Sequence, residues 1–209
     1  MNLNEVRYII AKFTDKLDAP EEFDVRLNFG QAKNFAVEWE KIMATPPELR
    51  DFSAVRPFKT ILGGQNPPMV LNQGNQYAYA ELPTDYFGKE SGTVFYGGQE
   101  MPIDFLEDAE FDYRKRNYIE VPTAEYPIGN IQSNFIRFLP KTLQTVNFSY
   151  IHTPLPIHFA YTTNRGFIEY DPSNSSELLW DDENIYKIIS YVLQDMGLQV
   201  TPEQVKAKK

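Results

Sequence analysis

The chain opens with apolar residues at helical spacing. One stripe of a first helix is formed by Val6, Ile9, Ile10, Phe13 and Leu17. The sequence DAPEE at 18–22 then gives a stop and a new start, because proline suits a first helical turn and glutamates favour the positive end of a helix dipole. The second helix is predicted to end near residue 42 and to bury Phe23, Leu27, Phe35 and Trp39. Because Pro46 and Pro47 close it, residues 1–50 are predicted to be a helical pair.

The pattern changes between residues 52 and 172. Short β-branched and aromatic runs are separated there by clusters of Gly, Pro and Asn, which is typical of strands and turns. A hairpin is predicted with its turn at 72–75, between apolar runs at 69–71 and 77–80. Further short strands are predicted at 93–96 and 119–121.

The strongest pair of strands in this region is 135–139 with 146–151. The second run alternates apolar and polar residues, as a strand with one covered face does. A short helix is predicted to interrupt the strands at 104–116, because Phe105, Ala109 and Tyr113 are spaced four apart.

A long connection follows from residue 152 to residue 174. It contains several prolines, and Asn164, Arg165 and Gly166 favour a small hairpin within it. Long ordered loops in compact proteins are often functional. We expect this connection to be either an arm that reaches a neighbouring subunit or a surface loop without a function.

The last element is predicted to be a closing helix at 178–200. Its apolar face is formed by Ile185, Ile188, Ile189, Val192, Leu193 and Met196. Acidic residues at 181–183 load its first turn, and Gly197 offers a stop. Residues 201–209 are polar and basic, and we expect a mobile tail or a docking segment there.

These elements predict an α+β fold over residues 1–209, organised as a single structural domain. The order is an N-terminal helix pair (1–50), a central antiparallel β-rich body with long loops (52–172), a C-terminal closing helix (178–200) and a tail (201–209). A chain of 209 residues can bury a core of its own without staples.

Composition narrows the cellular setting and the surface chemistry. The chain has no cysteine, which excludes disulfides and thiolate chemistry and fits a reducing compartment. The start lacks the apolar stretch of a signal peptide, and nowhere do roughly 18 apolar residues run together, so we expect a cytoplasmic protein without a membrane span. A net charge of -9 disfavours binding of nucleic acid by the overall surface. The 13 Tyr, 15 Phe and 15 Pro suit an assembly partner with many half-buried contacts.

The sequence contains few patterns that indicate a metal site, a catalytic nucleophile or a phosphate-binding loop. The two histidines, His152 and His158, have no local carboxylate partner, so a structural or surface role is expected rather than a metal site. No nucleophile elbow is present. The glycine pair at 63–64 is followed by two prolines, which cannot supply the N–H groups of a phosphate cradle, and the pair at 97–98 precedes no phosphate-binding helix.

Clustered charges leave several interpretations open. The acidic groups are Glu107, Asp108, Glu110 and Asp112, together with Asp181, Asp182 and Glu183. Such carboxylates serve glycosidases in pairs, but solvated charge at the starts of two helices explains them more simply. The basic cluster Arg114, Lys115 and Arg116 contacts nucleic acid, an acidic neighbouring subunit, or only water at the end of a helix. No catalytic, cofactor-binding or metal-binding residue is assigned, and the sequence favours a structural protein over an enzyme.

Five stretches resemble a known group of proteins when taken in order along the chain. They are PEEF at 20–23, ELPTDY at 81–86, PTAEYP at 122–127, FSYIHTPLP at 148–156, and YDPSNS at 170–175 leading through Leu179 and Trp180 into the closing helix. In this order the chain is similar to virion structural proteins of bacteriophages that infect Bacteroidetes, including crAss-like phages. The likeness spans most of residues 1–200.

The resemblance implies a head-to-tail connector or neck-ring subunit. Its partners would be copies of itself in a closed ring, usually twelve-fold, together with the portal and other neck or tail ring proteins. DNA would pass through the lumen without specific binding, and an acidic surface would keep it from adhering. No residue inherits a catalytic or ligand-binding role from the family.

Two other classes of function remain open at this point. One is another virion component, such as a head decoration or an internal cargo protein. The other is a small carbohydrate-active hydrolase or binding module, which would depend on carboxylates such as Glu107 and Asp181. For an assembly protein, the density of Pro, Gly and Asn beside aromatics predicts interfaces at 153–175 and in loops at 62–76 and 88–102.

Overall fold

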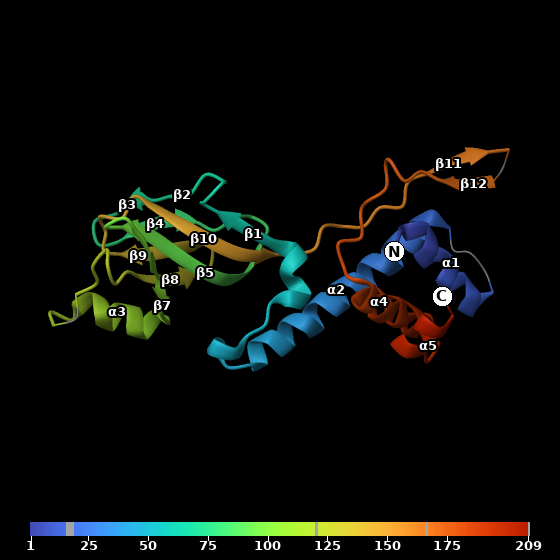
Figure 1. The fold of residues 1–209 in the computed structure, drawn as a ribbon, viewed down its shortest axis with the longest axis horizontal. Coiled ribbons are helices and arrows are strands. Elements are labelled where there is room, and N and C mark those ends of the chain that lie inside the picture. Colours follow the sequence, from blue (N-terminus) through green and yellow to red (C-terminus); the bar gives the residue numbers. More distant parts are fainter. Residues whose placement is uncertain (16–18, 120, 166, 209) are drawn as a thin grey trace. The chain divides into compact units, whose positions relative to one another are not determined.

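The computed structural model describes residues 1–15, 19–119, 121–165 and 167–208. Its mixed α+β class, with N-terminal helices, central sheets and C-terminal helices, confirms the predicted fold class. The chain divides into two compact units (Figure 1). The helical unit consists of Met1–Pro57 with Pro154–Lys209, and the sheet unit is Phe58–Thr153. A single domain over 1–209 stays a prediction.

The helical unit contains the predicted helix pair. Helix α1 (Leu3–Thr14) begins at Asn2, whose side chain accepts a hydrogen bond from the Glu5 N–H, while Glu5 bonds back to the Asn2 N–H. Helix α2 (Pro20–Ala44) has proline in its first turn, as the sequence indicates. Val6, Ile9, Ile10, Phe23, Leu27 and Phe35 are buried, whereas Phe13 and Trp39 are half-buried. Leu17, the last member of the first stripe, lies outside the described residues.

Short helical turns follow α2. They are η1 (Pro47–Leu49) and η2 (Ser53–Phe58), which includes Pro57. The ring of Phe52, between them, packs on the ring of Trp39 with 6.2 Å between centroids. This contact half-buries Trp39 in the C-terminal half of α2.

The closing helix is confirmed but is shorter than the predicted 178–200. Helix α4 (Asp182–Asp195) starts where the Asp181 side chain accepts a hydrogen bond from the Asn184 N–H. It stops before Gly197, whose φ of 86° lies in the left-handed region that glycine tolerates. The predicted apolar stripe packs against α2, with Ile189 and Leu193 fully buried.

Of the two predictions for 201–209, the mobile tail is wrong for the described part of that segment, and the docking segment stays a prediction. Residues Pro202–Ala207 form helix α5, which contacts α4. Thr201 and Gln204 cap its start reciprocally, and Val205 is fully buried. The Lys208 carbonyl also accepts a hydrogen bond from Lys12 Nζ at 2.9 Å, which ties the end of the segment to α1. Lys209 lies outside the described residues.

Close approach of α2 and α4 depends on a glycine. A Cβ added at Gly30 would lie 2.9 Å from Val192 Cγ2 and 3.0 Å from the Ile188 carbonyl oxygen. Gly30→Ala is expected to lower the free energy of unfolding by about 1–2 kcal/mol, because overpacking outweighs the gain in helix propensity. Thermal denaturation checks this, with Glu40→Ala at an exposed position of the same helix as the control. An unchanged or higher melting temperature for Gly30→Ala would contradict the tight crossing.

The sheet unit contains two five-stranded sheets. The first, called the β10 sheet, has the order β1-β10-β5-β6, and β2 also pairs with β10. Its strands are β1 (Lys59–Leu62), β2 (Met69–Val70), β5 (Tyr86–Tyr96), β6 (Gln99–Pro102) and β10 (Thr145–His152). The second, called the β9 sheet, has the order β3-β4-β9-β8-β7. Its strands are β3 (Asn72–Gln73), β4 (Ala78–Glu81), β7 (Asp104–Phe105), β8 (Ile128–Gln132) and β9 (Phe135–Leu139).

One apolar core is shared by the two sheets. Val94, Val146 and Phe148 of the β10 sheet and Ala78, Ile136 and Phe138 of the β9 sheet are buried in one cluster. Phe105 packs on both sheets. Its ring centroid lies 6.4 Å from that of Phe138 in the β9 sheet and 6.1 Å from that of Phe148 in the β10 sheet. Strand pairing is antiparallel as predicted, apart from the parallel pair β7–β8.

The strongest predicted strand pair is wrong as a pair, although both strands exist. Strand β9 pairs with β4 and β8, whereas β10 pairs with β1, β2 and β5. The chain passes from one sheet to the other at 140–144, so the two apolar faces meet across the core instead of side by side. The predicted hairpin at 69–80 is also displaced. Its strands are β3 and β4, and the run 69–70 is β2 of the other sheet.

The predicted helix at 104–116 begins later than expected. Residues 104–105 form β7, and helix α3 (Asp108–Arg116) follows. The predicted stripe therefore does not face the core: Phe105 lies in a strand, Ala109 and Tyr113 are exposed, and Phe111 is the fully buried residue of α3. A strand at 119–121 is wrong for Ile119 and Val121, and Glu120 lies outside the described residues.

Candidate interaction surfaces

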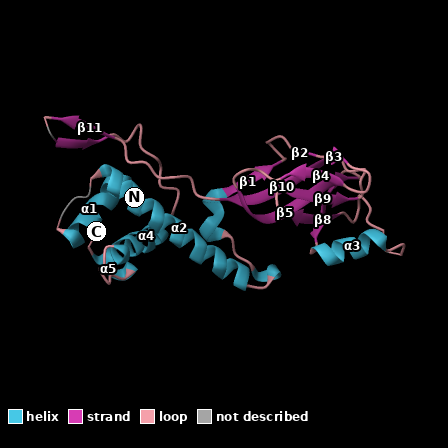
Figure 2. Ribbon diagram, turned by 180° about the vertical axis from the view of Figure 1, so that it is seen from behind, coloured by secondary structure: helices cyan, strands magenta, loops and turns pink. Residues whose placement is uncertain are grey.

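A two-stranded arm extends from the helical unit at the predicted hairpin. Strands β11 (Tyr161–Asn164) and β12 (Phe167–Tyr170) pair antiparallel and project away from the helices (Figures 1 and 2). Gly166 of the predicted turn lies outside the described residues, and Arg165 has a φ of 51°. We call residues 161–170 the arm. The arm belongs to the helical unit, so the β-rich body predicted at 52–172 ends earlier than expected.

Helix α2 anchors the irregular segment 155–159 that leads into the arm. Asn28 binds both backbone groups of Ile157, accepting from its N–H at 2.7 Å and donating to its carbonyl at 2.8 Å. The Asp24 carboxylate accepts from the Phe159 N–H at 2.8 Å, and the Gln31 amide donates to the Leu155 carbonyl at 3.0 Å. These three side chains lie on one face of α2 and satisfy an extended backbone as a neighbouring strand would. The base of the arm is therefore fixed.

At the base of the arm, the chain segments that enter and leave it are also bound to each other. The Ala160 N–H donates to the Ser175 hydroxyl at 2.9 Å, and the Asp171 N–H donates to the Ala160 carbonyl at 3.0 Å. The ring of Tyr170 packs on that of Phe159, which is 1% exposed, at 4.9 Å. The apolar contacts of the arm with its own unit are concentrated here, at its root.

One hydrogen bond ties the first strand of the arm to α2. The Tyr161 hydroxyl donates to Glu21 Oε1 at 2.7 Å. This bond raises the pKa of Tyr161 and lowers the pKa of Glu21, so Glu21 accepts as a carboxylate. Beyond this bond the arm is open on both faces. Every residue of β11 is exposed, and so are Phe167 (75%) and Ile168 (43%) of β12.

The other two predicted interface segments are more regular than expected. The segment 88–102 is wrong as a loop, because it forms β5 and β6 around a two-residue turn at Gly97 and Gly98. Both glycines have positive φ, as a tight hairpin requires. Phe95 and Tyr96 beside this turn are 73% and 51% exposed. Part of 62–76 forms β2 and β3 at the sheet edges. The interface role of these segments stays a prediction.

The basic cluster at 114–116, for which the sequence left an acidic neighbouring subunit open as a partner, lies in a further segment that carries exposed aromatic and apolar side chains. Residues 113–119 read YRKRNYI, and we call them the basic–aromatic segment. Tyr118 is 95% exposed, Ile119 93% and Tyr113 65%. The signal in the sequence is the pair of tyrosines around the basic cluster. The exposure of Ile119 was not expected, because the strand predicted at 119–121 would have half-buried this residue.

Helix α3, which carries this segment, is fixed to the β9 sheet by Arg137. This arginine is 7% exposed and donates to Asn130 Oδ1 through Nε at 3.1 Å and Nη2 at 2.6 Å. Nη2 also lies 3.1 Å from Asp108 Oδ1, and the guanidinium stacks on the Phe111 ring at 4.7 Å. Hydrogen bonds from Gln132 and Asn130, together with the charge of Arg137, lower the pKa of Asp108. The acidic start of α3 is thus used to bind its own sheet.

The remaining candidate residues for chemistry occupy structural positions. His158 Nδ1 lies 3.0 Å from Asp24 Oδ2, and the His152 ring packs edge-on against Phe58 in the sheet unit. Glu107 precedes α3 and Asp181 caps α4, as expected for charges at helix starts. Within the described ranges, no group of three or more His, Cys, Asp or Glu residues is placed to hold a metal ion.

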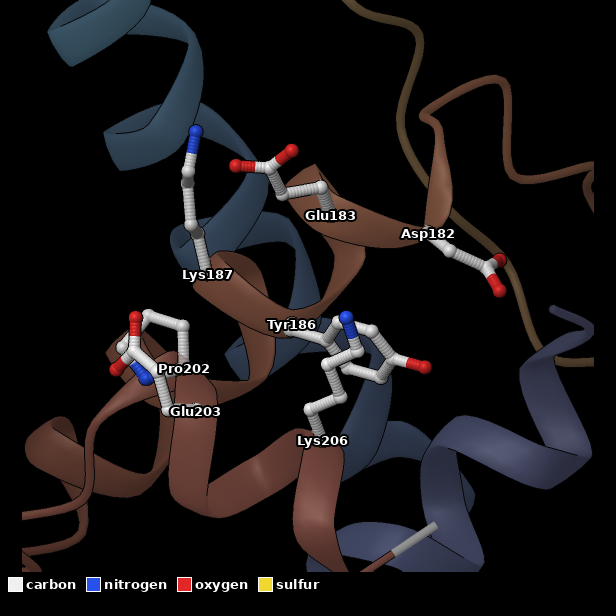
Figure 3. A pocket seen from close by; sticks show the side chains of 7 residues that line it. All are labelled: Asp182, Glu183, Tyr186, Lys187, Pro202, Glu203 and Lys206. Carbon is white, nitrogen blue, oxygen red and sulfur yellow. The ribbon is translucent and has the colours of Figure 1, made fainter.

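A surface hollow of about 590 Å³ lies between α4 and α5 (Figure 3). It is lined by Asp182, Glu183, Tyr186, Lys187, Pro202, Glu203 and Lys206. Lys187 Nζ lies 3.1 Å from Glu38 Oε1 on α2, and Glu38 also binds Lys41 at 2.9 Å. Burial raises the pKa of Glu38, but its hydrogen bonds to the two lysines outweigh burial and lower it overall. The charge of Lys187 is therefore directed toward α2.

No protein-family model and no curated protein matches this chain. Among the residues that the structure describes, no helix is both long and apolar enough to cross a membrane.

Proposed function

We propose that this protein is a structural subunit of a bacteriophage virion. In this proposal it forms a homo-oligomeric ring in the portal-proximal neck or tail, continues the DNA channel, and catalyses no reaction. The resemblance of its ordered motifs to virion proteins suggests the setting. The arm is the structural observation that supports an assembly role.

The argument from the arm is energetic. A hairpin of two short strands is at best marginally stable in water unless it packs on something else. The root of this arm is fixed by Asn28 and Asp24, yet Phe167 and Ile168 are exposed. Exposed apolar side chains on an anchored projection favour cover by another molecule. A neighbouring subunit in a ring supplies such cover at every position.

A closed ring also needs two different surfaces on each subunit, because one patch on a subunit must meet a different patch on the next. A projecting arm and a separate receiving surface satisfy that condition. The net charge of -9 agrees with a lumen that passes DNA without binding it. Portal-type and other neck or tail ring proteins would stack above and below.

Mass measurement of the purified full-length protein tests the proposal. We expect a closed assembly whose mass is a whole multiple of 24.2 kDa, near twelve-fold, and co-purification with portal-type proteins from phage particles. A monomer or dimer at every concentration, or turnover of a sugar that is lost in Glu107→Gln or Asp181→Asn, would contradict it.

A further inference from the structure

The basic–aromatic segment combines three cations with apolar side chains that water surrounds. Arg114, Lys115 and Arg116 form the last turn of α3, and Tyr118 and Ile119 follow directly. These two side chains are 95% and 93% exposed, so they are not stabilised by burial within their own unit. Contiguous exposed apolar side chains on a monomer typically mark a contact surface.

The segment is presented by an anchored element. Phe111 is fully buried, and Arg137 binds Asn130 and Asp108 beneath α3. The Lys115 ammonium donates to Gln76 Oε1 and lies 5.7 Å from the Tyr77 ring centroid. Because helix and basic turn are both fixed to the sheet unit, binding through them would cost little ordering entropy.

Protein is favoured over nucleic acid as the partner. A net charge of -9 opposes the approach of a polyanion, and three neighbouring cations are few for sequence-independent binding of phosphates. An acidic protein surface with some apolar area matches both the charge and the apolar side chains of the segment. Another copy of this chain offers such a surface.

We propose that the basic–aromatic segment of one copy docks into the α4–α5 hollow of a second copy. The proposal rests on the self-assembly proposed above and names the surfaces that meet. Glu183 and Glu203 line the hollow with exposed carboxylates, and Lys206 is an exposed cation of the same lining. The Asp182 carboxylate lies 3.3 Å from the Met1 ammonium, and Lys187 is held by Glu38. Glu183 and Glu203, which outnumber Lys206, therefore favour the arginines of the segment over an acidic partner.

The hollow also has the space and the apolar surface that the segment needs. Its volume of about 590 Å³ admits an aromatic side chain, and Tyr186 and Pro202 contribute apolar surface. The Glu203 N–H and the Thr201 hydroxyl lower the pKa of Glu203, which keeps it ionised near neutral pH. The segment and the hollow belong to different surfaces of the chain, so their contact is heterologous and can propagate around a ring.

A charge swap between two full-length variants tests this contact. Arg116→Glu reverses a charge of the segment, and Glu183→Lys reverses a charge of the hollow. Each variant alone is expected to weaken self-association about tenfold or more in sedimentation velocity, because like charges then face each other. Mixing the two purified variants is expected to restore assembly, since each then meets an opposite charge on the other. Lys141→Glu and Glu48→Lys, which make the same charge changes elsewhere at exposed positions, are the controls.

The outcomes separate this inference from the proposed function. If the wild-type protein assembles but the mixture gains nothing over the separate variants, the docking contact is wrong and the ring subunit stands. Wild-type protein that stays monomeric overturns both. If Arg116→Glu instead abolishes binding to duplex DNA and leaves assembly unchanged, the segment is a nucleic-acid contact. Tyr118→Ala, which changes no charge, is expected to weaken assembly as well, and full assembly of that variant would count against the docked segment.

Discussion

Replacing Phe167 and Ile168 of the arm with aspartate is expected to convert the assembled protein to monomers. Both side chains are exposed in the chain itself, so their loss removes contacts to another copy without opening a core. Central apolar contacts of this kind are each worth roughly 2 kcal/mol or more at an interface, which corresponds to a combined loss of affinity of about 1,000-fold or greater. Mass photometry over a concentration series measures the effect.

The control for the arm variant is Leu49→Asp. Leu49 is 72% exposed in the same helical unit, so it tests whether any apolar-to-acidic change on that surface disturbs assembly. We expect Leu49→Asp to assemble as the wild type does, and both variants to keep the circular dichroism spectrum of the folded wild type. Intact assemblies from the arm variant would show that the arm does not hold subunits together.

Phe148→Ala is expected to destabilise the sheet unit by about 3–5 kcal/mol. Phe148 is fully buried on β10 and its ring packs on Tyr86, Phe105 and Tyr150. Removing it leaves a cavity in the core that the two sheets share. Phe87→Ala, on the adjacent strand β5 and 40% exposed, is the control and is expected to cost far less.

Urea denaturation followed by two signals measures this change. Trp39 and Trp180 both belong to the helical unit, so tryptophan fluorescence reports that unit, whereas circular dichroism also follows the sheets. We expect the transition of the sheets to move to lower urea in Phe148→Ala. A shift of the tryptophan signal by the same amount would establish that the two units unfold as the single domain predicted from the sequence. An unchanged sheet transition would contradict the shared core.

The helices were predictable because their apolar faces are local in sequence. The stripe of α4 around Ile189 and the acidic residues at its start give both the element and its orientation. Helix α5 was missed because it has a single buried residue, Val205. Its signal was the capping pair Thr201 and Gln204 with proline between them, which the basic composition of the tail obscured.

Strand pairing could not be predicted in the same way, because partners in a sheet are chosen over long distances in sequence. The apolar run of β9 and the alternation in β10 predicted two strands correctly, but these patterns fit any neighbour that covers the same face. Strand β10 pairs with β5, whose partner residues lie more than 50 positions earlier in the sequence. Residues 140–144 carry the chain from β9 in one sheet to β10 in the other. In a β-hairpin the same residues would join two neighbouring strands of one sheet.

The candidate interaction surfaces also differ in whether a local signal in the sequence predicts them. The arm was predictable because turn residues around Arg165 are a local signal, and the prolines before it argue against a helix. The exposure of Tyr118 and Ile119 was not, since apolar residues in a sequence are normally assigned to the interior. The hollow between α4 and α5 depends on the docking of α5, which the sequence did not reveal.

Electron micrographs of the purified full-length protein test the central claim most directly. A chain whose anchored arm finds its cover in neighbouring copies is expected to give class averages of closed rings with an open centre, and phage particles are expected to show a ring of the same diameter below the portal. Micrographs that contain only isolated subunits, at concentrations where the protein is folded, would contradict the account.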